Sequence, residues 1–274
     1  MKRFFKVFAN AVVAVMLCCF AAGFAACEKT NTMVVRFSAG DGEYSLTLKL
    51  YPNLAENTVN KIMKYAKDGL YDDAIFYTME GYGSQIMVGD LKADGQEVVF
   101  NDVFPEITGE YEYAGHTGSD LKNKKGSVGL WRSWFANGSY STSSSASETG
   151  RGTWYLPTSD ISSYNGYFCV FATYDTSDSA NNEAITALTT LFSSSESYEY
   201  YRVYYTGTYD EAKTDENYGL TFHCVKESAY NEDSITDLFE ASDDADKSQL
   251  VRYNSTRVKL PVELSAKIIS VTVK

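Results

Sequence analysis

The stretch from Ile75 to Asp90 decides how the chain is interpreted, and it reads Ile-Phe-Tyr-Thr-Met-Glu-Gly-Tyr-Gly-Ser-Gln-Ile-Met-Val-Gly-Asp. Two short apolar runs, 75–79 and 85–88, lie on either side of Gly81-Tyr82-Gly83. Aromatic and β-branched residues in short runs bounded by glycine are typical of strands joined by a turn. We therefore predict two strands here that meet across a tight turn.

The residues before this stretch predict a further hairpin and a helix. Met33–Ser38 reads as a strand, and in Glu43–Tyr51 apolar and polar residues alternate, as in a strand that is buried on one face. From Leu54 to Asp68 the period becomes helical, because apolar residues recur three and four positions apart. This helical face is formed by Val59, Ile62, Met63 and Ala66.

The first 26 residues have the layout of a secretory signal peptide. Lys2, Arg3 and Lys6 precede an apolar run that ends at Ala25-Ala26-Cys27. Small residues before a cysteine resemble a bacterial lipobox, so we expect residues 1–26 to be removed and Cys27 to be lipidated. Cleavage by ordinary signal peptidase, which would leave a free Cys27, is the alternative. We expect an extracytoplasmic protein, anchored by lipid to a bacterial membrane through the tether 27–32.

The charge and the metal-binding residue types exclude several classes of partner. The 274-residue chain has a formal net charge of −12, and it becomes −15 once the three basic residues of the signal peptide are removed. Such a chain cannot neutralise a phosphate backbone, so we exclude nucleic acid. No spacing of cysteine and histidine indicates zinc, and the acidic run from Asp237 to Asp246 lacks the spacing of a calcium loop. We expect no metal and no cofactor.

Two cysteines remain in the body of the chain, Cys169 and Cys224, and both lie in apolar runs. An oxidising compartment would permit a disulfide between them. Two buried, unpaired thiols are an equally good interpretation of the same residues.

A series of segments follows a recognisable order along the chain. They are Leu50–Val59, Gly69–Phe76, the opening stretch, Gly126–Ser133, Gly152–Leu156 and Asn165–Phe171, followed by Pro261–Leu264 and Ile268–Val273. In this order they resemble the cyclophilin-type peptidyl-prolyl cis-trans isomerases.

The resemblance implies a mainly β fold, an eight-stranded antiparallel barrel capped by helices at both ends, with a binding groove on its outer surface. We expect one cyclophilin-like domain over residues 33–274. Glu183–Phe192 is the second predicted capping helix. An insertion of about 193–257 precedes the last strand, and within it we predict a strand at Gly219–Val225 and an acidic helix at Ser234–Asp246.

The resemblance also implies a chemistry that needs no nucleophile or cofactor. In the family an arginine donates a hydrogen bond to the prolyl nitrogen while an apolar pocket holds the ring. Carried over by position, the catalytic residues are Phe76, Tyr77 and Thr78, with Thr78 in place of the arginine. The peptide-binding residues carried over in the same way are Ile86, Met87, Leu130, Trp154, Leu156, Tyr164 and Phe168.

Two functions follow from this resemblance. The first is a peptidyl-prolyl isomerase that acts on extracytoplasmic proteins, with activity reduced because Thr78 cannot supply a fixed positive charge. The second is a non-catalytic peptide-binding or assembly lipoprotein on the same scaffold. In either case we expect a monomer that binds a proline-containing peptide or an unfolded extracytoplasmic protein and is attached to the membrane at Cys27.

Overall fold

The computed structural model describes residues 31–79, 84–95, 97–101, 103–116, 121–132, 135–136, 139–140, 150–194, 196–205, 221–226 and 250–274. The signal peptide, Cys27, the turn at 81–83, and the acidic helix at Ser234–Asp246 lie outside these residues and stay predictions. For the described residues between 194 and 257, the description covers the backbone alone.

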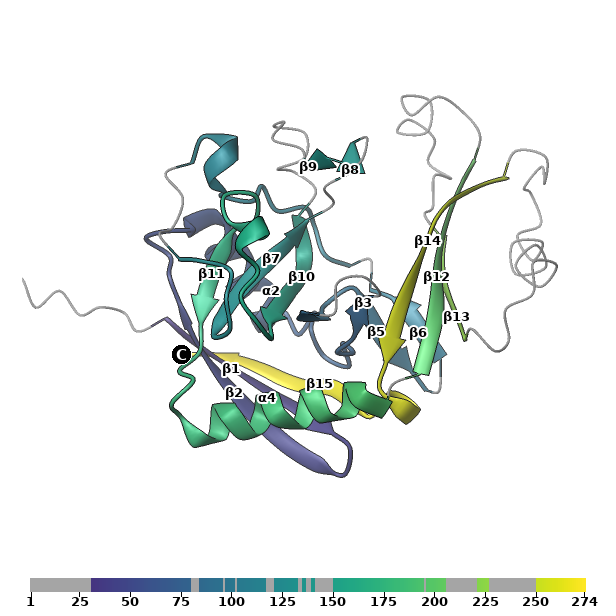
Figure 1. The fold of residues 1–274 in the computed structure, drawn as a ribbon, viewed down its shortest axis with the longest axis horizontal. Coiled ribbons are helices and arrows are strands. Elements are labelled where there is room, and N and C mark those ends of the chain that lie inside the picture. The colour runs from purple at the N-terminus through teal and green to yellow at the C-terminus, as the bar shows by residue number, and fades with distance from the viewer. Residues whose placement is uncertain are drawn as a thin grey trace, which may run out of the picture. The chain divides into compact units, whose positions relative to one another are not determined.

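A barrel of antiparallel strands forms the body of the fold (Figure 1). Seven strands pair in the order β15-β1-β2-β11-β7-β10-β4, and each neighbouring pair is antiparallel. Their bounds are β1 (Thr32–Ala39), β2 (Gly42–Leu50), β4 (Gln85–Val88), β7 (Ser127–Arg132), β10 (Gly150–Pro157), β11 (Val170–Thr173) and β15 (Ala266–Val273). The predicted first hairpin is therefore confirmed as β1 and β2.

An eighth segment, residues 74–77, joins the two edges of this sheet. The backbone N–H of Phe76 donates to the carbonyl of Ala266 in β15 at 3.0 Å. On the other side, Tyr77 and Met87 of β4 exchange two backbone hydrogen bonds of 2.9 and 2.7 Å. Because both edges are paired, the sheet closes on itself, which removes unpaired strand edges. The expected eight-stranded antiparallel barrel is confirmed.

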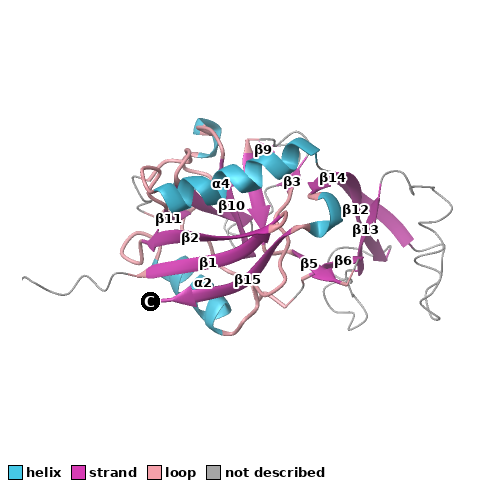
Figure 2. Cartoon of the chain, turned by 90° about the horizontal axis from the view of Figure 1, so that it is seen from below, coloured by secondary structure: helices cyan, strands magenta, loops and turns pink. Residues whose placement is uncertain are grey.

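Two α-helices pack on the barrel, α2 (Glu56–Lys67) and α4 (Ser179–Leu191) (Figure 2). Both were predicted from their apolar period, and α4 begins four residues earlier than expected. The carboxylate of Glu110 accepts hydrogen bonds from the backbone N–H groups of Asn57 and Thr58, in the first turn of α2, at 3.0 and 2.9 Å. The side chain of Asp178 caps α4 by accepting from the N–H of Asn181 at 2.9 Å. A carboxylate is favourable at these positions because the first N–H groups of a helix lack partners.

Alternation along the strands separates two clusters of apolar side chains. The larger one, which we call the inner cluster, fills the barrel and receives the apolar faces of both helices. Aromatic side chains meet within it: the ring centroids of Phe37 and Phe76 lie 5.0 Å apart, and those of Phe76 and Trp154 lie 6.3 Å apart. The smaller one, which we call the outer cluster, combines residues on the opposite faces of segment 74–77, β4 and β10 with residues from elements outside the barrel sheet.

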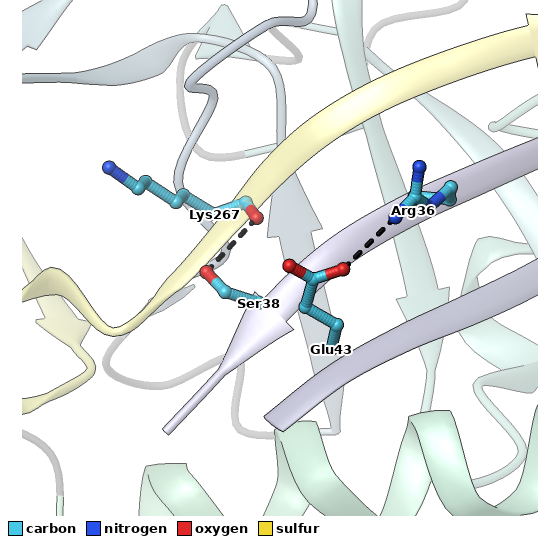
Figure 3. A network of polar contacts seen from close by, with 4 residues as sticks. All are labelled: Arg36, Ser38, Glu43 and Lys267. Carbon is cyan, nitrogen blue, oxygen red and sulfur yellow. Dashed lines mark hydrogen bonds and ion pairs between the residues drawn. The ribbon is translucent and has the colours of Figure 1, made fainter. Parts of the chain in front are cut away.

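Polar contacts at the β15-β1-β2 side of the barrel lie on its surface (Figure 3). Arg36 and Glu43 form an ion pair of 3.0 Å between β1 and β2, and both side chains are more than half exposed. Ser38 donates a long hydrogen bond of 3.4 Å to the carbonyl of Lys267 in β15. Exposed ion pairs contribute about 0–1 kcal/mol, so the apolar clusters hold the barrel together.

A four-stranded sheet, in the order β13-β12-β14-β3, carries the predicted insertion. Its strands are β3 (Thr78–Met79), β12 (Glu196–Tyr205), β13 (Thr221–Lys226) and β14 (Leu250–Leu260). The strand predicted at Gly219–Val225 is confirmed as β13. Smaller elements are the hairpins β5 (Leu91–Asp94) with β6 (Glu97–Phe100) and β8 (Phe135–Ala136) with β9 (Ser139–Tyr140), and the 3-10 turns Glu112–Ala114, Ser162–Tyr164, Phe192–Ser194 and Val262–Leu264.

Candidate functional site

The outer cluster is the candidate site, because the stretch that opened the sequence analysis contributes to it from two strands. Tyr77 and Met87 face each other across the pairing of segment 74–77 with β4. Tyr155 of β10 stands beside Met87 in register. The remaining described members are Ile75, Leu91, Tyr164, Phe168, Val258, Leu260 and Leu264.

Aromatic rings pack closely in this cluster. Tyr164 and Phe168 stack with centroids 4.5 Å apart, and Tyr155 meets each of them edge-on at 5.8 and 5.9 Å. Trp131, which is partly exposed, also stacks on Phe168, with ring centroids 5.4 Å apart. Aromatic pairs in such geometries contribute about 0.5–1.5 kcal/mol beyond their buried area, so the face is held rigidly.

The residues carried over from the resemblance do not share this face. Four of them, Tyr77, Met87, Tyr164 and Phe168, belong to the outer cluster. The side chains of Phe76, Ile86, Leu130, Trp154 and Leu156 are at most 1% exposed and belong to the inner cluster. The expectation of one groove lined by all of them therefore needs correction, because adjacent residues of a strand point to opposite faces. Thr78 is partly exposed in β3 and pairs in register with Lys259 of β14.

Three residues on this face were missed by the sequence analysis: Gln85, Trp131 and Tyr155. Strand alternation is the signal that could have found two of them. Gln85 lies two residues before Met87, and Tyr155 lies between two residues that enter the barrel. On β10 the outer-cluster residue, Tyr155, is thus one position away from Trp154 and Leu156, which were carried over from the resemblance.

A chain of hydrogen bonds fixes the hydroxyl end of Tyr155. Its hydroxyl donates to Oδ1 of Asn123, which is itself buried. The backbone N–H and the Nδ2 of Asn123 donate to Oδ1 of Asn165 at 2.8 and 3.2 Å. Burial raises the pKa of Tyr155 well above its usual range, and the neighbouring Tyr164 adds to the effect. Tyr155 is therefore a neutral hydrogen-bond donor that is fixed in one orientation.

Arg132 lies next to the cluster, but its guanidinium has structural contacts. Its Nε donates to the carbonyl of Tyr167 at 2.8 Å, and its Cζ lies 4.1 Å from the ring centre of Tyr111 and 5.4 Å from that of Phe168. The residue is 2% exposed, and burial lowers its pKa. A cation held between two rings in this way stabilises the packing. It is not displayed to a ligand from solvent.

Tyr77 connects the cluster to Asp90, the last residue of the diagnostic stretch. The Tyr77 hydroxyl donates to Oδ1 of Asp90 at 2.7 Å. Burial raises the pKa of Asp90 to about 6, although the hydrogen bond from Tyr77 and the positive charge of Arg151 both lower it. The preceding Gly89 has φ of 131°, and a Cβ there would lie 2.8 Å from the backbone of Gly152 and Thr153. Glycine is therefore required where β4 and β10 approach.

Gln85 leaves a hydrogen-bonding group unused. Its side chain is 1% exposed, and its Nε2 has a weak contact with Sδ of Met87 at 3.9 Å. Its Oε1 is buried and has no hydrogen-bond partner among the residues that the structure describes. An unpaired buried acceptor costs about 1–3 kcal/mol, so this amide is an unusual feature next to an apolar face.

Cys169 is a free thiol on the opposite side of the strands, buried in the inner cluster. Its Sγ donates to the hydroxyl of Thr58 at 3.7 Å, and burial raises its pKa to about 12. Of the two interpretations of the cysteines, the structure shows the buried thiol at Cys169. The side chain of Cys224 lies outside the described residues.

The described part of the chain contains no group of three or more His, Cys, Asp or Glu side chains arranged to hold a metal ion. Within the same residues, no helix has both the length and the apolar character needed to span a bilayer.

Comparison with known proteins gives structural similarity without sequence relatives. No protein-family model and no curated protein matches the sequence. Two solved structures of a cyclophilin type peptidyl-prolyl cis-trans isomerase from Cryptosporidium parvum are similar, one of them determined in the presence of the dipeptide Ala-Pro. Both are 16% identical to this chain, with TM-scores of 0.39 and 0.40. The matches cover 58% and 59% of this chain and 84% and 83% of theirs.

The strand pairing of this chain carries the assignment of its fold. Residues 74–77 close an eight-stranded antiparallel barrel, two helices pack on it, and the segments noted in the sequence fall on its strands, its first helix and the connections between them. The fold is cyclophilin-like. It is a divergent example, because the outer cluster is rich in aromatic residues and Thr78 stands where the sequence resemblance implies an arginine.

Proposed function

We propose that the protein is a cyclophilin-type peptidyl-prolyl cis-trans isomerase acting on extracytoplasmic proteins, with reduced turnover. The observation that carries the proposal is the outer cluster, an aromatic face built on the strand pair 75–79 and 85–88. Its rings offer an apolar surface for a proline side chain. The signal-peptide layout of residues 1–26 of the chain supports action outside the cytoplasm.

The reaction asks little of the protein in chemical terms. Rotation about an X–Pro bond is slow because resonance gives the C–N bond partial double-bond character. A catalyst therefore needs to bind the twisted amide more tightly than the planar one, and each ~1.4 kcal/mol of that preference is worth tenfold in rate. A planar amide is the more polar form, so an aromatic surface that excludes water favours the twisted form.

The expectation of reduced turnover rests on two residues, Thr78 and Arg132, neither of which offers a positive charge to the substrate. Thr78 has a neutral hydroxyl where the resemblance implies a guanidinium. Arg132 is committed to the carbonyl of Tyr167 and to two rings. A neutral donor stabilises a developing lone pair less than a charged donor, because charge-assisted hydrogen bonds are roughly twice as strong.

A second candidate, a non-catalytic peptide-binding lipoprotein on the same scaffold, is favoured by one observation. The described members of the outer cluster are at most 7% exposed, and two of them, Val258 and Leu260, come from β14. A peptide would have to displace part of the protein's own chain to reach this face, and a site of that kind can hold a peptide without accelerating its rotation.

Exchange NMR on a short Ala-Pro peptide, with and without the chain from Glu28 onwards, separates the two candidates. We expect a faster cis-trans exchange that is unchanged in Ile269→Ala, a surface control on β15. It should fall at least tenfold in Met87→Ala, measured at a temperature where circular dichroism shows this variant to be folded, because Met87 is itself fully buried. Phe76→Ala is a poor test, because Phe76 lies in the inner cluster and its loss would destabilise the barrel. Thr78→Arg should raise the rate. Peptide binding without acceleration, in the wild type and in Thr78→Arg, would leave the binding protein as the answer.

Membrane attachment through Cys27 is a separate part of the proposal. Cells that express the full chain should yield it in the membrane fraction, and Cys27→Ser should release it to the soluble fraction. A single acyl chain binds membranes weakly, and several chains bind stably. Recovery of Cys27→Ser in the membrane fraction would overturn the lipid anchor.

A further inference from the structure

The end of β14 lies along the strand that carries the candidate site. Val258 pairs with Met79 and Lys259 pairs with Thr78, in antiparallel register. The end of β14, which directly follows the predicted insertion, therefore lies as a strand beside β3, immediately after Tyr77. Strand addition of this kind is a common way for a protein to hold an extended peptide, because backbone hydrogen bonds give affinity and alternate side chains give specificity.

Side chains of this segment alternate between the outer cluster and solvent. Val258 and Leu260 are 3% and 0% exposed and pack in the outer cluster, whereas Lys259 between them is exposed. Pro261, which follows directly, is also buried. The segment thus presents two aliphatic side chains, at alternate positions, to the face on which Tyr77 and Met87 lie, and a buried proline follows them.

This arrangement leaves one polar group of the face unsatisfied. The Oε1 of Gln85, on the same face of β4 as Met87, is buried without a hydrogen-bond partner among the described residues. Buried acceptors in proteins are normally paired, and those that are not call for an explanation. A ligand whose backbone N–H reached this oxygen would satisfy it, which the segment Val258–Pro261 does not do.

We propose that Val258–Pro261 is an internal ligand of the outer cluster and the template of the external one. The external ligand is an extended peptide segment with aliphatic side chains at alternate positions followed by proline. It binds by displacing the end of β14 from β3, and it gives Gln85 the donor that the internal segment lacks. This inference rests on the proposed peptide-binding function and adds to it the class of ligand and the step that admits it.

Competition sets the expected size of the effect. The apparent dissociation constant of the external ligand equals its intrinsic value divided by the fraction of time for which the internal segment leaves the site free. The more firmly the internal segment is bound, the weaker the external ligand binds. Truncating the two anchoring side chains removes most of the internal contact. External peptide should then bind at least tenfold more tightly.

The test uses the full chain and a fluorescent synthetic peptide that copies residues 256–263, Thr-Arg-Val-Lys-Leu-Pro-Val-Glu. Fluorescence anisotropy compares the wild type, the double variant Val258→Ala with Leu260→Ala, and the matched control Lys259→Ala on the same strand. We expect at least tenfold tighter binding by the double variant and no change in the control. A peptide with alanine in place of its proline should bind more weakly.

Equal or weaker binding by the double variant overturns the internal ligand while leaving peptide binding intact. Absence of binding by all three proteins overturns the proposed function together with this inference. Because Val258 and Lys259 pair with β3, hydrogen exchange on the wild type provides a second readout that needs no mutation. Saturating peptide should speed exchange of the amides at 258–260. Unchanged protection there, with peptide bound, would show that the peptide occupies another surface.

Discussion

Replacing Asp90 with asparagine tests the electrostatics at the edge of the candidate site. Asp90 accepts the Tyr77 hydroxyl at 2.7 Å and has a pKa of about 6, raised chiefly by burial. Asparagine keeps an oxygen acceptor of the same shape in the same place and removes the negative charge. The variant therefore isolates the cost of burying this carboxylate.

The pH at which that cost appears follows from the two pKa values. The folded protein holds the proton of Asp90 up to about pH 6, whereas the unfolded chain releases it near the ordinary value of 3.8. Below pH 4 both states are protonated, and the carboxyl costs nothing. Between pH 4 and 6 the unfolded state is ionised first, so stability falls as the pH rises. Above pH 6 the loss levels off at about 3 kcal/mol, because each pKa unit corresponds to about 1.4 kcal/mol.

Urea unfolding of the wild type and of Asp90→Asn at pH 4, 5, 6 and 7 measures this difference. We expect the two to have nearly equal free energies of unfolding at pH 4, and the variant to be more stable by up to about 3 kcal/mol at pH 7. The exposed Asp94→Asn serves as the control for removing a charge nearby. A difference that is the same at all four pH values would refute the argument, as would a variant that is less stable at pH 7.

Three other substitutions test the packing around the outer cluster by chemical denaturation. Gly129→Ala should destabilise by about 1–3 kcal/mol, because its Cβ would lie 2.3 Å from Cζ of the fixed Tyr155 ring. Tyr155→Phe should cost about 1–3 kcal/mol, because it leaves the buried Oδ1 of Asn123 without its donor; wild-type stability would refute this. Arg132→Met keeps the apolar stem but removes the donor to a backbone carbonyl, and a loss of about 1–3 kcal/mol is expected; a neutral effect would show that the guanidinium contacts contribute nothing.

Local patterns in the sequence were sufficient for the elements of the barrel. The alternation from Tyr44 to Leu50 predicted β2, and the period through Val59, Ile62 and Ala66 predicted α2, because both depend on residues that are near in sequence. The cyclophilin-type resemblance supplied the barrel as a whole. Its closure by residues 74–77 against β15 depends on contacts between residues nearly two hundred positions apart, and no local pattern carries that information.

The candidate site was harder to predict than the fold. The resemblance gives the sequence position of each site residue, whereas the pleat of the strand decides which face of the sheet its side chain occupies. Ile86 and Met87 are adjacent in β4, so they cannot both line one surface. The structure places Ile86 in the barrel and Met87 outside. On β10, the resemblance assigned the peptide-binding role to Trp154 and Leu156, which point into the barrel. Tyr155 between them is the residue that belongs to the outer cluster. An error of one position in a helix would have moved a side chain by 100°, but in a strand it reverses the face.

The pairing between β14 and β3 affects both isomerase activity and the access of a peptide to the outer cluster. Four outer-cluster members at the site, Tyr77, Met87, Tyr164 and Phe168, are nearly inaccessible to solvent, so no peptide can contact them without a rearrangement. The barrel strands pair with one another, whereas Val258 and Leu260 belong to β14, which pairs with β12 and β3 in the four-stranded sheet. Movement of β14 is the rearrangement that disturbs the barrel least. Turnover and peptide affinity should therefore respond together to substitutions at these two positions, and a change in one without the other would separate the catalytic face from the binding face.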